Sequence, residues 1–174
     1  NMNIDGVRYH FEVCGDGLRP LVLFHGFTGD YTTWTPFSES FGKYSKIIIP
    51  DIIGHGKTES PDVLSRYQIE SAASDLRKIL DHMDIKQVDL LGYSMGGRLA
   101  LTFALLFPER VRKLILESAS PGLSTESERE LRRRKDAGLA HFIREKGISS
   151  FVDYWEEIPL FFTMKRLPSA VQQK

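Results

Sequence analysis

Ser94 stands at the centre of residues 92–96, with the sequence GYSMG, and its surroundings favour a chemical role. An apolar run over 88–91 leads into this motif, and a helix-forming run over 98–107 leads out of it. A sharp turn from strand to helix exposes a serine hydroxyl at the carboxyl edge of a sheet, and glycine two residues before and after it avoids a steric collision. The alternative is a glycine-rich turn whose serine only caps the helix. The flanking strand and helix favour the first interpretation, so we take Ser94 as the candidate nucleophile or its mechanistic equivalent.

A reacting serine in such an elbow needs backbone N–H groups for the negative charge that develops on the substrate. One donor is expected in residues 24–29, with the sequence FHGFTG, which follow an apolar run. The other is the residue after the serine, so the expected donors are the amides of Phe27 and Met95. His25 precedes Ser94 in the chain, whereas an elbow of this type places its catalytic histidine last, so we do not expect His25 to be the base.

The remaining polar clusters predict no metal site. Residues 51–56, with the sequence DIIGHG, follow the next apolar run. We interpret them as a tight glycine turn, because one histidine and one carboxylate are too few ligands for a metal. Cys14 is the only cysteine, which excludes an internal disulfide, and we expect it to pack within a strand.

The length and composition of the chain indicate one domain without net charge. The chain has 174 residues, enough for one ordinary domain, and its 23 basic residues equal its 23 acidic ones. This balance gives no global charge that would favour nucleic acid or an acidic membrane as a partner. The sequence has neither a secretory signal pattern nor a run of about 18 apolar residues, so we expect a cytoplasmic protein.

Short apolar runs alternate along the chain with segments that can hold helices, which is typical of a parallel sheet with crossover helices. An Asp5-Gly6 turn between residues 3–4 and 7–13 predicts an antiparallel hairpin before that sheet. Apolar residues at helical spacing predict a helix over 68–83 that covers one sheet face. The strands expected in the parallel sheet are 21–24, 47–49, 88–91 and 111–116.

The pattern changes from Ser124 onward. Glutamates precede the basic run 132–135, an order that a helix favours. An aromatic segment follows, so a helical lid over a site and plain helical packing both fit. We therefore divide the chain into a core over 1–122 and a lid over 123–174. The apolar and aromatic residues of this segment are Phe142, Ile143, Phe151, Tyr154, Trp155, Leu160, Phe161 and Phe162.

Residues 25–27, 51–56 and 92–98 together resemble the α/β-hydrolase superfamily over nearly the whole chain. Arg98, residues 117–123 and the arginine-rich segment make the chain most similar to one of its families, the 2-succinyl-6-hydroxy-2,4-cyclohexadiene-1-carboxylate synthases of menaquinone biosynthesis. The resemblance implies a mostly parallel sheet with an N-terminal antiparallel hairpin, helices on both faces and a helical lid.

The resemblance also implies a reaction. The family is a carbon–carbon lyase that eliminates pyruvate from 2-succinyl-5-enolpyruvyl-6-hydroxy-3-cyclohexene-1-carboxylate, with proton abstraction by serine, histidine and aspartate and without a cofactor. Its substrate is a small polycarboxylate, which the planar guanidinium of arginine suits. Arg133 or Arg134 could fill the role given to Arg132. The substrate-binding residues that the family implies are Tyr93, Arg98, Arg132 and Trp155.

The triad itself departs from the family pattern. Only His141 follows Ser94, and it falls in a helical pattern over 136–146. Asp136 cannot orient His141, because five residues of helix correspond to about 500° of rotation and place the two side chains on different faces. Glu117 lies where some members carry their acid, but we expect an orienting role for it.

We therefore expect the triad acid and histidine, with the last strands and helices of the fold, beyond Lys174. The chain alone should then be inactive, with an exposed sheet edge at 111–116 that takes a C-terminal fragment of the same protein or a second copy. Two other functions stay open. One is an esterase or a carbon–carbon bond hydrolase of the same fold, and the other is a non-catalytic binding protein.

Overall fold

A computed structural model of the chain describes residues 1–159 and 166. The internal contacts divide the chain into two units, Asn1–Pro121 and Gly122–Lys174. The first unit contains the elbow and both expected oxyanion donors. The second contains the expected lid segment, and the division falls one residue before the boundary expected from the sequence.

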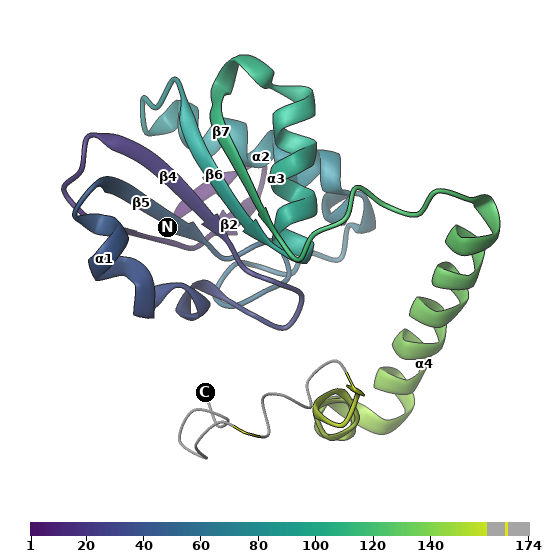
Figure 1. The fold of residues 1–174 in the computed structure, drawn as a ribbon. Coiled ribbons are helices and arrows are strands. Elements are labelled where there is room, and N and C mark those ends of the chain that lie inside the picture. The colour runs from purple at the N-terminus through teal and green to yellow at the C-terminus, as the bar shows by residue number, and fades with distance from the viewer. Residues whose placement is uncertain (160–165, 167–174) are drawn as a thin grey trace. The chain divides into compact units, whose positions relative to one another are not determined.

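The first unit is built on a five-stranded sheet in the order β3-β5-β4-β6-β7 (Figure 1). β3 runs antiparallel to β5, and the other neighbouring strands run parallel. The four parallel strands predicted from apolar runs are confirmed. β4, β6 and β7 each extend one or two residues beyond one end of the predicted range, and β5 extends beyond both ends. The strands of the unit are β1 (Met2–Ile4), β2 (Val7–Tyr9), β3 (Phe11–Cys14), β4 (Arg19–Phe24), β5 (Ser45–Pro50), β6 (Val88–Tyr93) and β7 (Val111–Glu117).

The predicted N-terminal hairpin is present as β1 paired with β2, but the single strand expected over 7–13 is wrong. The chain leaves the hairpin at His10 and continues as β3 in the large sheet. The N–H of His10 donates to Thr58 Oγ1 at 2.9 Å, and its carbonyl accepts from the N–H of Asp51 at 3.0 Å. The loop after β5 thus forms hydrogen bonds with both backbone groups of His10, and the strand is interrupted there.

Apolar side chains pack on both faces of the sheet. The hairpin, α2 and α3 lie on one face, where Val22, Ile48 and Leu90 are fully buried. Trp34 packs with Leu23 and strand β5 on the other face. α2 confirms the helix predicted over 68–83. The helices of the unit are α1 (Ser38–Gly42), α2 (Ile69–His82), α3 (Met95–Leu106) and the 3-10 turns η1 (Tyr31–Thr33), η2 (Thr35–Phe37), η3 (Leu64–Tyr67) and η4 (Pro108–Arg110).

β7 forms one edge of this sheet, and within the described residues it pairs only with β6. Ile115 and Leu116 on β7 are 49% and 41% exposed. An unpaired strand with apolar side chains is a template for pairing with another chain. We expect the purified chain to associate, and Ile115→Lys to raise the dissociation constant about tenfold, the equivalent of 1.4 kcal/mol.

Sedimentation velocity over a range of protein concentrations measures this association. Leu64→Lys is the matched control, because Leu64 is 84% exposed and lies outside the edge strand. A wild-type chain that stays monomeric at high concentration, or equal effects of the two substitutions, would contradict the prediction.

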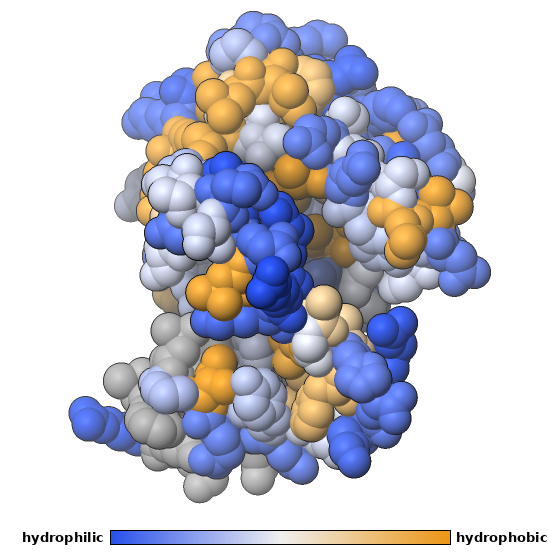
Figure 2. Space-filling view, turned by 90° about the vertical axis from the view of Figure 1, so that its right-hand side faces the viewer, coloured by the Kyte–Doolittle hydropathy of each residue, from blue (hydrophilic) through white to orange (hydrophobic). Residues whose placement is uncertain are grey.

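Most of the described part of the second unit is the helix α4 (Glu126–Glu156). Thr125 begins the helix with a capping box, since its hydroxyl accepts from the N–H of Glu128, whose carboxylate accepts from the N–H of Thr125. The helix bends at Gly147, where φ is 80°. Figure 2 shows the charged stretch of α4 as a band of hydrophilic residues. The helical pattern predicted over 136–146 is confirmed within this element.

Part of the aromatic segment expected in the lid, Leu160, Phe161 and Phe162, lies outside the described residues. In the part of the chain that the structure describes, no helix is both long and apolar enough to cross a membrane.

Candidate active site

Ser94 forms the turn between β6 and α3 with φ 52° and ψ −112°. A positive φ is rare for a residue other than glycine, and such strain persists where the surrounding structure holds it. The N–H of Ser94 donates to the carbonyl of Glu117 at 2.9 Å, and its carbonyl accepts from the N–H groups of Gly97 and Arg98. Its side chain makes no capping hydrogen bond to α3, so the structure does not show the alternative role of a helix cap.

The glycines on either side of Ser94 lie where the turn is most crowded. A Cβ on Gly92 would lie 2.4 Å from the carbonyl oxygen of Gly96. A Cβ on Gly96 would lie 2.5 Å from the carbonyl oxygen of His25. The steric reason for glycine at both places, argued from the motif, is therefore present in the structure.

The loop after β4 lies against this elbow. A Cβ on Gly26 would be 2.9 Å from the ring of Tyr93 and 3.6 Å from the Cβ of Ser94. Phe27 follows Gly26 directly, and Met95 follows Ser94, so both expected oxyanion donors come from segments that meet here. Their role as donors stays a prediction.

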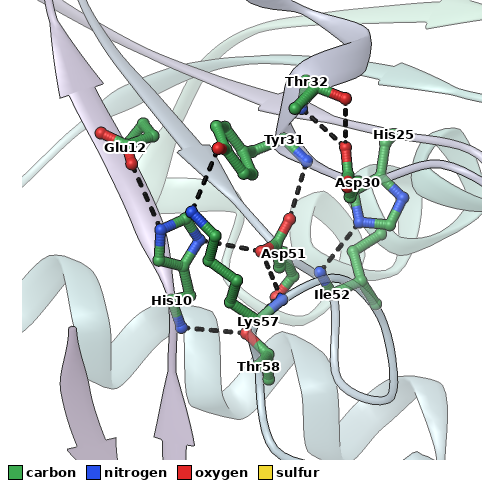
Figure 3. Close-up of polar contacts among 10 residues, drawn as sticks. All are labelled: His10, Glu12, His25, Asp30, Tyr31, Thr32, Asp51, Ile52, Lys57 and Thr58. Carbon is green, nitrogen blue, oxygen red and sulfur yellow. Dashed lines mark hydrogen bonds and ion pairs between the residues drawn. The ribbon is translucent and has the colours of Figure 1, made fainter. Parts of the chain in front are cut away.

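His25 is fully buried, and both of its ring nitrogens have backbone partners. Nδ1 lies 2.8 Å from the carbonyl oxygen of Gly26. Nε2 accepts from the N–H of Ile52 at 3.0 Å, as Figure 3 shows. Since the carbonyl can only accept and the amide can only donate, the ring is neutral with its proton on Nδ1. Burial lowers the pKa of His25, which favours the same neutral form. A ring held in this way has no nitrogen left to accept a proton from Ser94.

Asp51 is the centre of a buried polar network that Figure 3 shows beside His25. Its Oδ1 accepts from the N–H of Tyr31 at 2.7 Å, and its Oδ2 accepts from the N–H of Lys57 at 2.9 Å. Oδ2 also lies 2.8 Å from Nδ1 of His10. This carboxylate thus ties the loop after β4, the loop after β5 and the start of β3 together.

The sequence interpretation treated residues 51–56 as a glycine turn and missed this network. The signal was a carboxylate directly after the apolar run 47–50, because a charge at that place is buried and needs several donors. Its partners lie 6 to 41 positions away in the chain, so no local pattern identifies them.

Arg98 lies one turn into α3 and is exposed. Among residues 1–159 and 166, its guanidinium has no hydrogen bond or ion pair. Arg112 shows the contrast, since Asp89 holds its guanidinium through two bonds of 2.6 and 2.8 Å. Tyr93 is 36% exposed beside Ser94. Tyr93, Ser94 and the exposed Arg98 thus lie within six residues of one strand-to-helix turn, and the role of Tyr93 and Arg98 in substrate binding stays a prediction.

The other two expected binding residues belong to the second unit. Arg132 Nε donates to both carboxylate oxygens of Asp136, at 2.8 and 2.9 Å. The ring of Trp155 packs on Phe151 at 5.4 Å between centroids. Each of the neighbouring basic residues Arg133 and Arg134 pairs with a glutamate of the same helix. The role of Arg132 and Trp155 in substrate binding stays a prediction.

The structure gives no triad partner for Ser94 within the first unit. His141 lies in α4, and the carboxylate of Asp136 binds Arg132. Glu117 contacts the elbow through its backbone carbonyl, and the orienting role expected for its carboxylate stays a prediction. Within the described residues, no three His, Cys, Asp or Glu side chains are grouped so that they could hold a metal ion.

Several known proteins are similar to this chain over most of its length. A Bacillus subtilis (strain 168) protein that is provisionally named 2-succinyl-6-hydroxy-2,4-cyclohexadiene-1-carboxylate synthase is 44% identical over 171 residues, which are 98% of this chain and 62% of that protein. The synthase of the same name from Shigella flexneri is 32% identical over 85% of this chain and 57% of its own length. The solved structure of MenH from S. aureus matches with a TM-score of 0.86 and 35% identity, over 95% of this chain and 62% of that one.

The chain thus spans 62% and 57% of the length of these two relatives. A family profile described as the alpha/beta hydrolase fold matches residues 19–151. This range begins with β4 and includes the elbow, the loop after β4 and most of α4. From this match and the strained serine between β6 and α3, the chain belongs to the α/β-hydrolase family.

Proposed function

We propose that this protein is an enzyme of menaquinone biosynthesis that eliminates pyruvate from 2-succinyl-5-enolpyruvyl-6-hydroxy-3-cyclohexene-1-carboxylate. The observation that carries the proposal is the exposed guanidinium of Arg98, one helical turn after Ser94, which has no partner among the described residues. The names of the relatives from B. subtilis and S. flexneri support it. A polycarboxylate substrate needs a cation at the reacting serine, whereas a hydrolase of neutral esters does not.

The chemistry is a proton transfer followed by an elimination. Ser94, activated by a histidine and an acid that lie outside this chain, removes a proton from the cyclohexene ring. The electron pair shifts through the ring and the enolpyruvyl group departs, taking a proton at its methylene carbon to become pyruvate. Because that group is attached through an ether oxygen, the bond that breaks is carbon–oxygen. The carbon–carbon lyase class expected from the resemblance is corrected accordingly.

The roles of the remaining residues follow from this step. The amides of Phe27 and Met95 stabilise the enolate-like charge that develops as the proton leaves. For substrate binding we propose Arg98 and Tyr93 of the first unit, and the resemblance gives the same role to Arg132 and Trp155 of the second unit. As the partner that completes the site we propose a C-terminal segment of the same protein, with a second copy of the chain as the alternative.

Arg98→Ala tests the proposal in the full-length protein, with pyruvate release as the measurement. We expect KM to rise by about 10- to 100-fold, because a hydrogen bond to a charged group contributes about 1.5–3 kcal/mol. Arg98→Lys should recover part of the loss, since lysine keeps the charge without the planar fork. Arg19→Ala is the control, because Arg19 is also exposed and begins β4, at the opposite end of the parallel strands from Ser94.

Other outcomes would support the other functions. Turnover of p-nitrophenyl esters without pyruvate release indicates an esterase. Reaction of Ser94 with a fluorophosphonate in the full-length protein would count against a binding protein without catalysis. An unchanged KM in Arg98→Ala would remove the basis of the proposal.

A further inference from the structure

The peptide unit between Gly26 and Phe27 is held by its carbonyl group. The oxygen of Gly26 lies 2.8 Å from His25 Nδ1 and accepts from the N–H of Gly29 at 3.1 Å. In a planar trans peptide, the C=O and the N–H point in opposite directions. Two hydrogen bonds to the Gly26 carbonyl therefore also fix the direction of the Phe27 N–H.

The imidazole of His25 cannot turn without breaking a second bond. Its Nε2 accepts from the N–H of Ile52 at 3.0 Å, and the side chain is fully buried (Figure 3). Ile52 follows Asp51, whose carboxylate is itself held by several donors. His25 is thus a rigid bridge from the loop after β5 to the carbonyl of Gly26.

A second contact fixes the next peptide of the same loop. Nε2 of His55 lies 2.5 Å from the carbonyl oxygen of Phe27, and the rings of His55 and His25 are 5.2 Å apart between centroids. The loop after β5 therefore holds the peptide before Phe27 through His25 and the peptide after it through His55. Gly26 itself lies against Ser94, since a Cβ placed on Gly26 would be 3.6 Å from the Cβ of Ser94.

We propose that His25 is a positioning residue of the active site: its Nδ1–H holds the Gly26 carbonyl and thereby orients the Phe27 N–H as an oxyanion donor for the reaction at Ser94. Its catalytic part rests on the function proposed above. The structural part, that Nδ1–H fixes this peptide, does not.

Two substitutions separate the ring nitrogens. Asparagine places a side-chain N–H near the position of Nδ1 and can still donate to Gly26, but it does not reach Ile52. Glutamine places an amide oxygen near Nε2 and can accept from Ile52, but it has no donor for Gly26. A merely structural histidine would lose similar function in both variants, whereas a positioning one is rescued by asparagine.

In kinetics of pyruvate release by the full-length protein, we expect His25→Gln to lower kcat about 10- to 100-fold with KM nearly unchanged. This loss is smaller than the ∼10²–10³-fold loss on removing an oxyanion donor outright. His25→Asn should keep kcat within about threefold of the wild type, in line with the intact donor to Gly26. Equal losses in the two variants, or an unchanged kcat in His25→Gln, would overturn the proposal.

Amide hydrogen exchange tests the same idea without any turnover, so the proposed function can fail separately. The Gly29 amide, which donates to Gly26, should exchange faster in His25→Gln than in His25→Asn. The Tyr31 amide, which donates to Asp51, serves as an internal control and should stay protected in both.

If either variant fails to fold, imidazole ¹⁵N shifts of the wild-type protein decide the structural part. They should show Nδ1 protonated and Nε2 unprotonated, and an unprotonated Nδ1 would overturn it.

Discussion

Ser94→Ala is expected to lower kcat for pyruvate release by at least about 10³-fold, while the dissociation constant of the substrate changes little. Removing one member of a triad leaves only the catalysis that the oxyanion donors and substrate binding provide. The binding groups proposed here, Arg98 and Tyr93, do not depend on the Ser94 hydroxyl. Single-turnover kinetics of the full-length protein, together with a binding titration of the inactive variant, separate the two quantities.

The backbone at Ser94 supplies the controls for this experiment. Ser94→Gly also removes the hydroxyl, but glycine adopts the φ of 52° without strain, so its folding stability should match or exceed that of Ser94→Ala. Ser118→Ala removes a serine hydroxyl at a comparable φ of 49°, just beyond β7, and should leave kcat unchanged. Substantial turnover in both Ser94 variants would exclude the serine as the proton-abstracting group.

The elbow could be predicted because its determinants are local. Glycine spacing, the apolar run before Ser94 and the helical run after it lie within about twenty residues, and they gave β6 and α3 in the right order. The periodic apolar residues of α2 predicted it equally well. The beginning of α4 is also encoded locally, since Thr125 and Glu128 have the spacing of a capping box.

Features that depend on distant partners could not be predicted. Nothing in the sequence around His10 shows that the strand must divide there, because Thr58 and Asp51 supply its hydrogen bonds. Chain order excludes His25 as the catalytic base, in agreement with its two bonded ring nitrogens, but its contact with Ile52 depends on how two loops meet. Arg132 was expected to bind substrate on resemblance alone, and its partner Asp136 follows from helical spacing only once the helix is known.

Asp51→Ala is expected to lower the free energy of unfolding by about 3–5 kcal/mol, because it removes one partner from a buried charged network. The N–H groups of Tyr31 and Lys57 and the ring of His10 then lose their acceptor together. Such a loss is a large part of the roughly 5–15 kcal/mol that stabilises an ordinary domain. Urea denaturation followed by circular dichroism measures it.

Two further variants show whether the hydrogen-bond network of Asp51 or a negative charge alone accounts for the lost free energy of unfolding. Asp51→Asn keeps the shape and one acceptor oxygen but turns an amide N–H₂ toward a donor, so its loss should lie between those of the wild type and Asp51→Ala. Asp62→Ala removes an exposed carboxylate and should change stability by no more than about 0.5 kcal/mol. A loss below about 1 kcal/mol in Asp51→Ala would mean that water replaces the carboxylate as acceptor. The loop that carries Phe27 would then be held mainly by His25 and His55, since Asp51 anchors that loop only through Tyr31.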